Sequence, residues 1–163
     1  MIKVFVDSGS SIKLHEKEKY DVEILPLKIL LNGKEYLDGV DLSMDVFYDE
    51  LINNKQFPKT SLPSLEIVER EVLKSVDNGD DVIILTISSG ISGTFNALSM
   101  LFEDQPKVKV VDSNTTDLED MQKALELLHG SVSETGVLLH YTSQLDVEIN
   151  EGELKEAYKG IFE

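Results

Sequence analysis

The chain has 163 residues, a formal net charge of −16 and a hydrophobic content of 41%. These values fit one folded domain, or one domain with an appendage, rather than a disordered chain. The negative charge repels phosphate backbones and anionic membranes, so it argues against nucleic-acid binding. The absence of cysteine excludes disulfides and thiolate metal sites.

No apolar run approaches the roughly 20 residues that span a bilayer. The N-terminal stretch MIKVFVDSGS does not have the pattern of a signal peptide. We therefore expect a cytoplasmic protein without a membrane span. No two histidines are spaced like metal ligands, and we expect neither a metal nor a cofactor.

Short apolar segments rich in β-branched residues alternate with segments of helical periodicity. The predicted strands are 2–6, 22–31, 81–87, 108–111 and 136–141, and the predicted helices are about 10–19, 43–54, 64–77, 91–103, 116–129 and 152–161. Asn32-Gly33-Lys34 predicts a tight turn, so residues 22–37 are expected to hold a hairpin. Strands apolar on both faces and followed by helices indicate an α/β fold, with a mostly parallel sheet and helices on both faces.

Two of the predicted helices begin after a serine. Ser43 and Ser64 are expected N-caps, because a serine hydroxyl can accept a hydrogen bond from the first turn of a helix. The apolar residues expected on one face are Val46, Phe47, Leu51 and Ile52 in the first helix, and Leu65, Val68, Val72 and Val76 in the second.

Small polar residues gather where predicted strands end and helices begin. They occupy residues 7–10, 88–94 and 112–114, and Thr60-Ser61 precedes the helix near Ser64. Ligands of open α/β sheets bind at this edge, where helix N-termini favour a carboxylate or phosphate oxygen. The same residue types also cap helices in ordinary α/β proteins, so a site and simple capping both remain open. The chain has neither a P-loop lysine pattern nor G-x-G-x-x-G, and nucleotide binding has no direct support.

Several of these segments together resemble one known family. IKVFVDSGSSI, YDVEILPLKILLNGKEYLDGVDLSMDVFYDEL, PKTSLPS, ISSGISGTFNA and VKVVDS occur in the order found in the DegV family, over about residues 1–113. The resemblance implies a bacterial fatty-acid-binding protein that presents the acyl carboxylate to a fatty-acid kinase. It implies that Thr60 and Ser92 hold the carboxylate, with Ser61 and the backbone of Gly93 as close neighbours. Asp7 and Ser8 match the family's first strand and are interpreted as mainly structural.

The chain also departs from the family pattern. DegV proteins resemble a two-domain clamp whose second domain supplies an arginine and a histidine near the carboxylate. The only arginine here, Arg70, is expected on a solvated helix face. His140 is either a substitute for the missing histidine or a packed residue, whereas His15 and His129 are expected at the surface.

We therefore expect residues 1–163 to form a single DegV-like domain with a divergent C-terminal part. Residues 112–163 hold 12 acidic and three basic residues, and residues 114–163 depart from the family, with a candidate join at 129–136. The chain would then be a natural one-domain relative, a remnant, or a chain without its second domain.

Three functions follow from these observations. The first is a non-catalytic carrier of a fatty acid or similar amphiphilic carboxylate, binding weakly as a monomer and more tightly as a homodimer that covers the cleft. The second is an interaction module or remnant that lacks a lid and lipid binding, in which the hydroxyls only cap helices. The third is a phosphoryl-handling enzyme, in which His140 would be the base.

Overall fold

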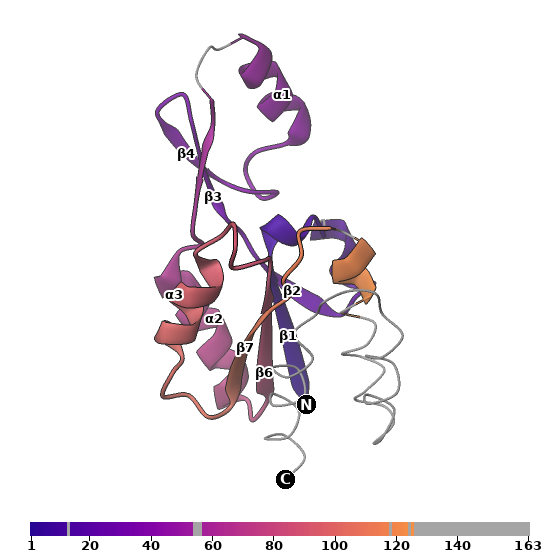
Figure 1. Ribbon diagram of the computed structural model, residues 1–163, viewed down its shortest axis with the longest axis vertical. Coiled ribbons are helices and arrows are strands. Elements are labelled where there is room, and N and C mark those ends of the chain that lie inside the picture. The colour runs from indigo at the N-terminus through magenta and orange to yellow at the C-terminus, as the bar shows by residue number, and fades with distance from the viewer. Residues whose placement is uncertain (13, 54–56, 118, 124, 126–163) are drawn as a thin grey trace.

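The computed structural model describes residues 1–12, 14–53, 57–117, 119–123 and 125. A four-stranded parallel sheet in the order β2-β1-β6-β7 forms the centre of the molecule (Figure 1). Its strands are β1 (Ile2–Asp7), β2 (Val22–Leu25), β6 (Asp81–Thr86) and β7 (Val108–Asp112). Five of the six residues of β6 are buried, as expected for a central strand covered on both faces.

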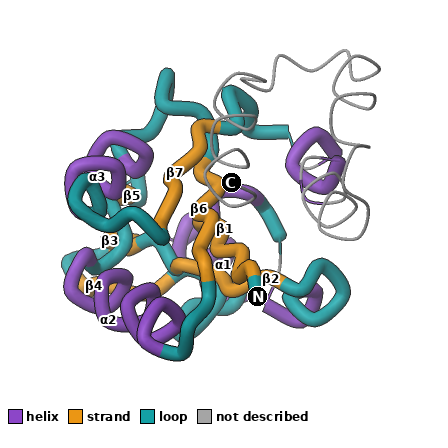
Figure 2. The backbone as a smooth tube through the Cα atoms, turned by 90° about the horizontal axis from the view of Figure 1, so that it is seen from below, coloured by secondary structure: helices purple, strands orange, loops and turns teal. Residues whose placement is uncertain are grey.

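Both faces of the parallel sheet are covered. On one face lie α2 (Leu65–Asp77) and α3 (Thr94–Leu101), on the same side of the strands in Figure 2. The buried core on this side comprises Phe5, Leu25, Val68, Val72, Val82, Ile84, Leu98, Phe102 and Val108. The core of the other face comprises Val4, Val6, Ile12, Tyr20, Val22, Ile83, Leu85, Val111, Met121 and Leu125. The predicted fold class, a mostly parallel α/β sheet covered on both sides, is confirmed.

A second, antiparallel sheet projects beyond the carboxyl ends of these strands (Figure 1). It has the order β4-β3-β5 and consists of β3 (Lys28–Leu31), β4 (Lys34–Leu37) and β5 (Lys59–Ser61). The predicted turn joins β3 to β4, with φ of 52° at Asn32 and 78° at Gly33, as a tight hairpin requires. A small core of Ile29, Leu31 and Leu42 holds this sheet together with α1 (Met44–Asn53).

Three predictions of secondary structure are wrong or incomplete. Segment 22–31 forms two strands in different sheets, separated by Pro26 and Leu27, because proline has no N–H for a sheet ladder. The described residues of segment 10–19 form no α-helix, and the short 3-10 turns η1 (Ser8–Ser10) and η2 (Leu14–Glu16) lie there instead. The left-handed backbone of Ser11, with φ of 63°, interrupts a helix there. β5 was not predicted, since its three exposed polar residues show no apolar alternation.

The predicted helix caps are found in part. The Ser43 hydroxyl accepts a hydrogen bond from the N–H of Val46 at 3.4 Å. Ser64 occupies the N-cap position of α2, but its hydroxyl makes no capping hydrogen bond.

The predicted apolar faces are also only partly buried. In α2, Val68 and Val72 are buried, whereas Leu65 is 37% exposed. In α1, Phe47 packs against the small core, whereas Ile52 is 80% exposed.

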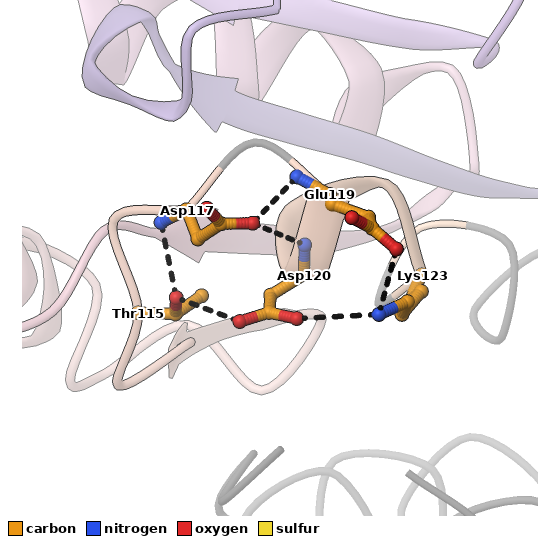
Figure 3. A network of polar contacts seen from close by, with 5 residues as sticks. All are labelled: Thr115, Asp117, Glu119, Asp120 and Lys123. Carbon is orange, nitrogen blue, oxygen red and sulfur yellow. Dashed lines mark hydrogen bonds and ion pairs between the residues drawn. The ribbon is translucent and has the colours of Figure 1, made fainter. Parts of the chain in front are cut away.

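The described end of the chain returns to the parallel sheet. Residues 119–123 and 125 are helical, within the predicted helix 116–129. The Asp117 carboxylate begins this segment by accepting hydrogen bonds from the N–H groups of Glu119 and Asp120, at 2.9 and 3.2 Å (Figure 3). Several predictions concern residues outside the described part of the chain. These are the candidate join at 129–136, the strand at 136–141, the helix at 152–161, and the roles of His129 and His140. No helix in the described part of the chain is long and apolar enough to cross a membrane.

Candidate functional site

The loop between β6 and α3, residues 87–93, is held from both sides by carboxylates at the ends of neighbouring strands. The N–H of Ile87 donates to Oδ2 of Asp7, which ends β1, at 2.9 Å. The N–H of Ser89 donates to Oδ1 and Oδ2 of Asp112, which ends β7, at 3.1 and 3.2 Å. Both carboxylates are buried, so these charge-assisted bonds are shielded from water.

Hydrogen bonds within the loop complete its shape. The Ser88 hydroxyl accepts from the N–H of Gly90 at 3.2 Å, and the Ser88 carbonyl accepts from the N–H groups of Ile91 and Ser92 at 3.2 and 3.1 Å. The N–H of Ser88 donates to the carbonyl of Thr115 at 2.9 Å. The loop is therefore a fixed structure from which α3 begins.

A cavity of about 310 Å³ lies between this loop and β5. It is lined by Leu27, Thr60, Ser61, Leu62, Ile87, Ile91, Ser92 and Gly93. The structure thus brings all four residues named by the sequence, Thr60, Ser61, Ser92 and Gly93, into the lining of one cavity. Their role in holding a carboxylate remains a prediction.

The two hydroxyls expected to bind the ligand differ in their surroundings. Thr60 is exposed on β5, opposite Ile29 in the ladder, and its hydroxyl makes no hydrogen bond to the described residues. The Ser92 hydroxyl accepts from the N–H of Thr94 at 3.2 Å and lies 2.9 Å from the Thr94 hydroxyl. Ser92 therefore contributes to the start of α3, in agreement with the capping interpretation, while its side chain also lines the cavity.

Asp7 and Ser8 have the structural role expected of them. Beside the Asp7–Ile87 bond, the Ser8 hydroxyl accepts from the N–H of Leu27 at 3.0 Å and so fixes a residue of the cavity wall. Arg70 is solvated, as expected, with a side chain 66% exposed and an ion pair to Glu71 at 3.0 Å. His15 is exposed, also as expected. The described residues contain no group of three or more acidic, histidine or cysteine side chains placed to hold a metal ion.

Asp7 is electrostatically unusual among these residues. Burial raises its pKa to about 6, against the lowering effect of the backbone N–H groups of Ile87, Gly9 and Ser10. Its second oxygen, Oδ1, is buried and has no hydrogen-bond partner among the described residues. The carboxylate therefore holds the loop through one oxygen and leaves the other unsatisfied.

The sequence did not identify the apolar part of the cavity. Leu27, Leu62, Ile87 and Ile91 line it beside the polar residues. Leu62 directly follows Ser61, Ile87 directly precedes the polar segment 88–94, and Ile91 lies within that segment. The sequence pattern does not place Leu27 in a cavity wall, because segment 22–31 has the pattern of one continuous strand.

A comparison with known protein families shows to which family the chain belongs. Residues 1–129 match the family described as "Uncharacterised protein, DegV family". The chain belongs to the DegV family. The match confirms the resemblance seen over residues 1–113 and extends it to residue 129.

Known DegV proteins share both sequence and fold with this chain. A DegV domain-containing protein of Clostridium perfringens is 36% identical over 121 residues, which are 71% of this chain and 42% of that protein. A stearic acid-binding protein from Eubacterium ventriosum has 31% identity and a TM-score of 0.72, covering 90% of this chain and 52% of that one. A fatty-acid-binding DegV family protein from Thermus thermophilus has 26% identity and a TM-score of 0.72, covering 88% of this chain and 52% of that one. This DegV chain thus spans about half the length of the relatives that it matches.

The raised pKa of Asp7 predicts how the stability of this DegV chain depends on pH. The pKa of Asp7 is about 6 in the folded state, against an ordinary value of 3.8. Between pH 3.8 and pH 6, the carboxyl is therefore protonated in the native state and ionised in the unfolded state. Asp7 therefore adds stability below about pH 4, and this is lost as pH rises through 6, a change of about 3 kcal/mol. Urea unfolding from pH 4 to 7 should show that the wild type loses stability relative to Asp7→Asn by this amount. Parallel curves for the two proteins would contradict the assignment.

Gly9 is expected to be required by the packing beneath the cavity. A Cβ at this position would lie 2.7 Å from Cδ1 of Ile87 and 2.9 Å from Oδ1 of Asp7, both shorter than real contacts. Gly9→Ala should lower the free energy of unfolding by about 1–3 kcal/mol, as overpacking of a buried site does. Gly93→Ala is the control for denaturant unfolding, since the nearest atom to its Cβ would be at 3.7 Å. Equal stability of the two variants would show that Gly9 is not constrained.

Proposed function

We propose that this DegV-family chain binds the carboxylate of a fatty acid in the cavity between β5 and the β6–α3 loop, and that it acts as a carrier without catalysing a reaction. The observation that carries the proposal is the meeting of Thr60, Ser61, Ser92 and Gly93 with apolar side chains in one cavity. The structural relatives from Eubacterium ventriosum and Thermus thermophilus are both described as fatty-acid-binding, and this supports the proposal.

The hydrogen-bond donors of the cavity lining are uncharged hydroxyl and backbone N–H groups, which can bind an anionic headgroup. The Thr60 hydroxyl and the N–H of Gly93 make no hydrogen bonds to the described residues, so both are available to a ligand. The Ser92 hydroxyl can turn its proton toward the ligand while still accepting from the N–H of Thr94. The start of α3 adds the partial positive charge of its unpaired amides.

The apolar wall suits the first part of an acyl chain. Ile87 is 7% exposed and forms a buried part of this wall, whereas Ile91 is 72% exposed at its margin. A cavity of about 310 Å³ is at the lower end of the range for ligand sites. Each methylene contributes about 0.8 kcal/mol only when it is buried. We therefore expect weak binding by one chain, and tighter binding where a second copy or a fatty-acid kinase partner covers the rest of the ligand.

A binding role accounts for the hydroxyls better than catalysis does. The side-chain partner of Ser92 among the described residues is Thr94, whose hydroxyl cannot act as a general base near neutral pH. The alternative, a module without lipid binding, would leave Thr60 without a role, because its hydroxyl caps no helix.

Removing either hydroxyl should weaken ligand binding. We expect Thr60→Val and Ser92→Ala each to weaken decanoate binding by about tenfold, the effect of losing one hydrogen bond of about 1.5 kcal/mol to a charged group. Isothermal titration calorimetry on the full chain measures the affinity. The methyl ester of decanoate should bind far more weakly than decanoate, since it lacks the anionic oxygen that the cavity is proposed to recognise.

Matched variants separate binding from stability. Thr116→Val and Ser99→Ala remove the same groups outside the cavity lining and should leave the affinity unchanged. Native mass spectrometry of the purified chain should also detect a co-purified acyl ligand. Equal affinity of wild type and both cavity variants would refute the proposed contacts, and absence of any binding would refute the function.

Gly93 is expected to keep the cavity open to the headgroup. It has an ordinary φ of −78°, so alanine suits its backbone, and an added Cβ would point into the lining, 3.7 Å from Cδ2 of Leu62. Gly93→Ala should therefore weaken decanoate binding several-fold, while unfolding free energy falls by about 1 kcal/mol or less. Gly90→Ala, in the same loop but outside the lining, is the control in both measurements. Unchanged affinity in Gly93→Ala would place the headgroup elsewhere.

A further inference from the structure

A buried carboxylate lies directly behind the cavity wall. Asp7 is fully buried, and its Oδ2 accepts from the N–H of Ile87, whose side chain lines the cavity. Its Oδ1 has no hydrogen-bond partner among the described residues. A carboxylate in this state is under-stabilised, because burial has removed water from an oxygen that no donor replaces.

Gly9 shows how close Asp7 is to the lining residues. The position of a Cβ on Gly9 would be 2.7 Å from Cδ1 of Ile87, 2.9 Å from Oδ1 of Asp7 and 3.4 Å from Cδ1 of Leu27. Three atoms that all lie so near one point belong to one packed group. The unsatisfied oxygen of Asp7 is therefore packed in one group with two side chains of the cavity lining, Ile87 and Leu27.

Among the described residues, no charged side chain compensates Asp7. In its own sheet the other charged residues are Lys3 of β1, Glu23 of β2, Asp81 of β6, and Lys109 and Asp112 of β7. Lys28 lies on β3, and His15 and Asp38 line a separate cavity with Ser8. None of them is among the causes of its raised pKa, which are burial and, acting in the opposite direction, backbone N–H groups. An anion in the cavity would thus add a second negative charge to a site that already lacks a positive one.

We propose that Asp7 is a positioning residue that couples occupation of the cavity to uptake of a proton, so that an anionic ligand binds more tightly as pH falls. The inference rests on the proposed carboxylate site. On binding, a proton from solvent forms an O–H bond with Oδ1 of Asp7, while Oδ2 continues to accept from the N–H of Ile87. The loop keeps its anchor, and the repulsion between the two carboxylates is removed.

The pH window of the effect follows from Asp7 itself. Its pKa of about 6 in the free protein means that it is mostly ionised at pH 7.5 and mostly protonated at pH 5. The nearby ligand charge raises this pKa, and each unit of the rise corresponds to a tenfold change in affinity. We expect decanoate affinity to increase roughly three- to tenfold from pH 7.5 to pH 5. The factor is modest because the apolar wall separates the ligand carboxylate from Asp7 and so weakens their repulsion.

The test compares the affinity of the full chain and of Asp7→Asn over this pH range. Decane-1-sulfonate serves as a second ligand, because its headgroup stays charged throughout and cannot itself produce the trend. Calorimetry in two buffers of different ionisation enthalpy at pH 6.5 measures proton uptake on binding. Asp104→Asn is the matched control, since it also removes one carboxylate charge but Asp104 is exposed and lies outside the cavity lining.

The expected result is a pH-dependent affinity with proton uptake in the wild type and in Asp104→Asn, and a flat profile in Asp7→Asn. If Asp7→Asn does not fold, carboxyl NMR titration of the wild type decides the question, since the pKa of Asp7 should rise on adding decane-1-sulfonate. Binding with the same pH profile in wild type and Asp7→Asn, or an unchanged Asp7 pKa, would overturn the coupling and leave the carboxylate site intact. Absence of binding at every pH would refute the carboxylate site, and the coupling with it.

Discussion

The hydrogen bonds from the N–H groups of Ile87 and Ser89 to Asp7 and Asp112 fix the backbone between β6 and α3. Bonds to charged groups typically contribute about 1.5–3 kcal/mol each, and here both acceptors are shielded from water. The order β1-β6-β7 makes this arrangement possible, because it places β6 between the two strands that end in aspartate. The position of Ser92 and Gly93, and the direction in which α3 begins, depend on these two anchors.

The two anchors are chemically alike but differ in how well they are satisfied. Asp112 accepts from Ser89 and from the N–H of Asn114 at 2.9 Å, so both of its oxygens have partners. Oδ1 of Asp7 has no hydrogen-bond partner among the described residues, and burial raises the pKa of this carboxyl to about 6. Asp7 is also closely packed, since a Cβ on Gly9 would lie 2.9 Å from its Oδ1.

The sequence predicted the parts of the fold that burial alone determines. Strands such as 81–87 are apolar on both faces, and this pattern identifies a covered parallel sheet without further information. The interruption at Pro26 and Leu27 was hidden within a continuous apolar run, and β5 has three exposed polar residues that pair only because β3 lies beside them. The polar half of the cavity could be predicted, because Thr60 and Ser92 lie in family motifs and Ser92 also lies at the start of the predicted helix 91–103. The apolar half could not, since Leu27 acquires its place from the division of that run between two sheets.

Leu27 connects the local structure of the site with its overall geometry. It lies at the junction of β2 in the parallel sheet and β3 in the antiparallel sheet, and β3 carries β5 with Thr60. Its N–H donates to the Ser8 hydroxyl at 3.0 Å and its carbonyl accepts from the N–H of Asp38 at 2.9 Å, so its backbone is fixed on both sides. Leu27 therefore contributes to the relative placement of Thr60 on β5 and the loop after β6 that carries Ser92. The cavity beside it holds about 310 Å³, so an acyl chain that extends beyond this volume needs a second surface to bury it.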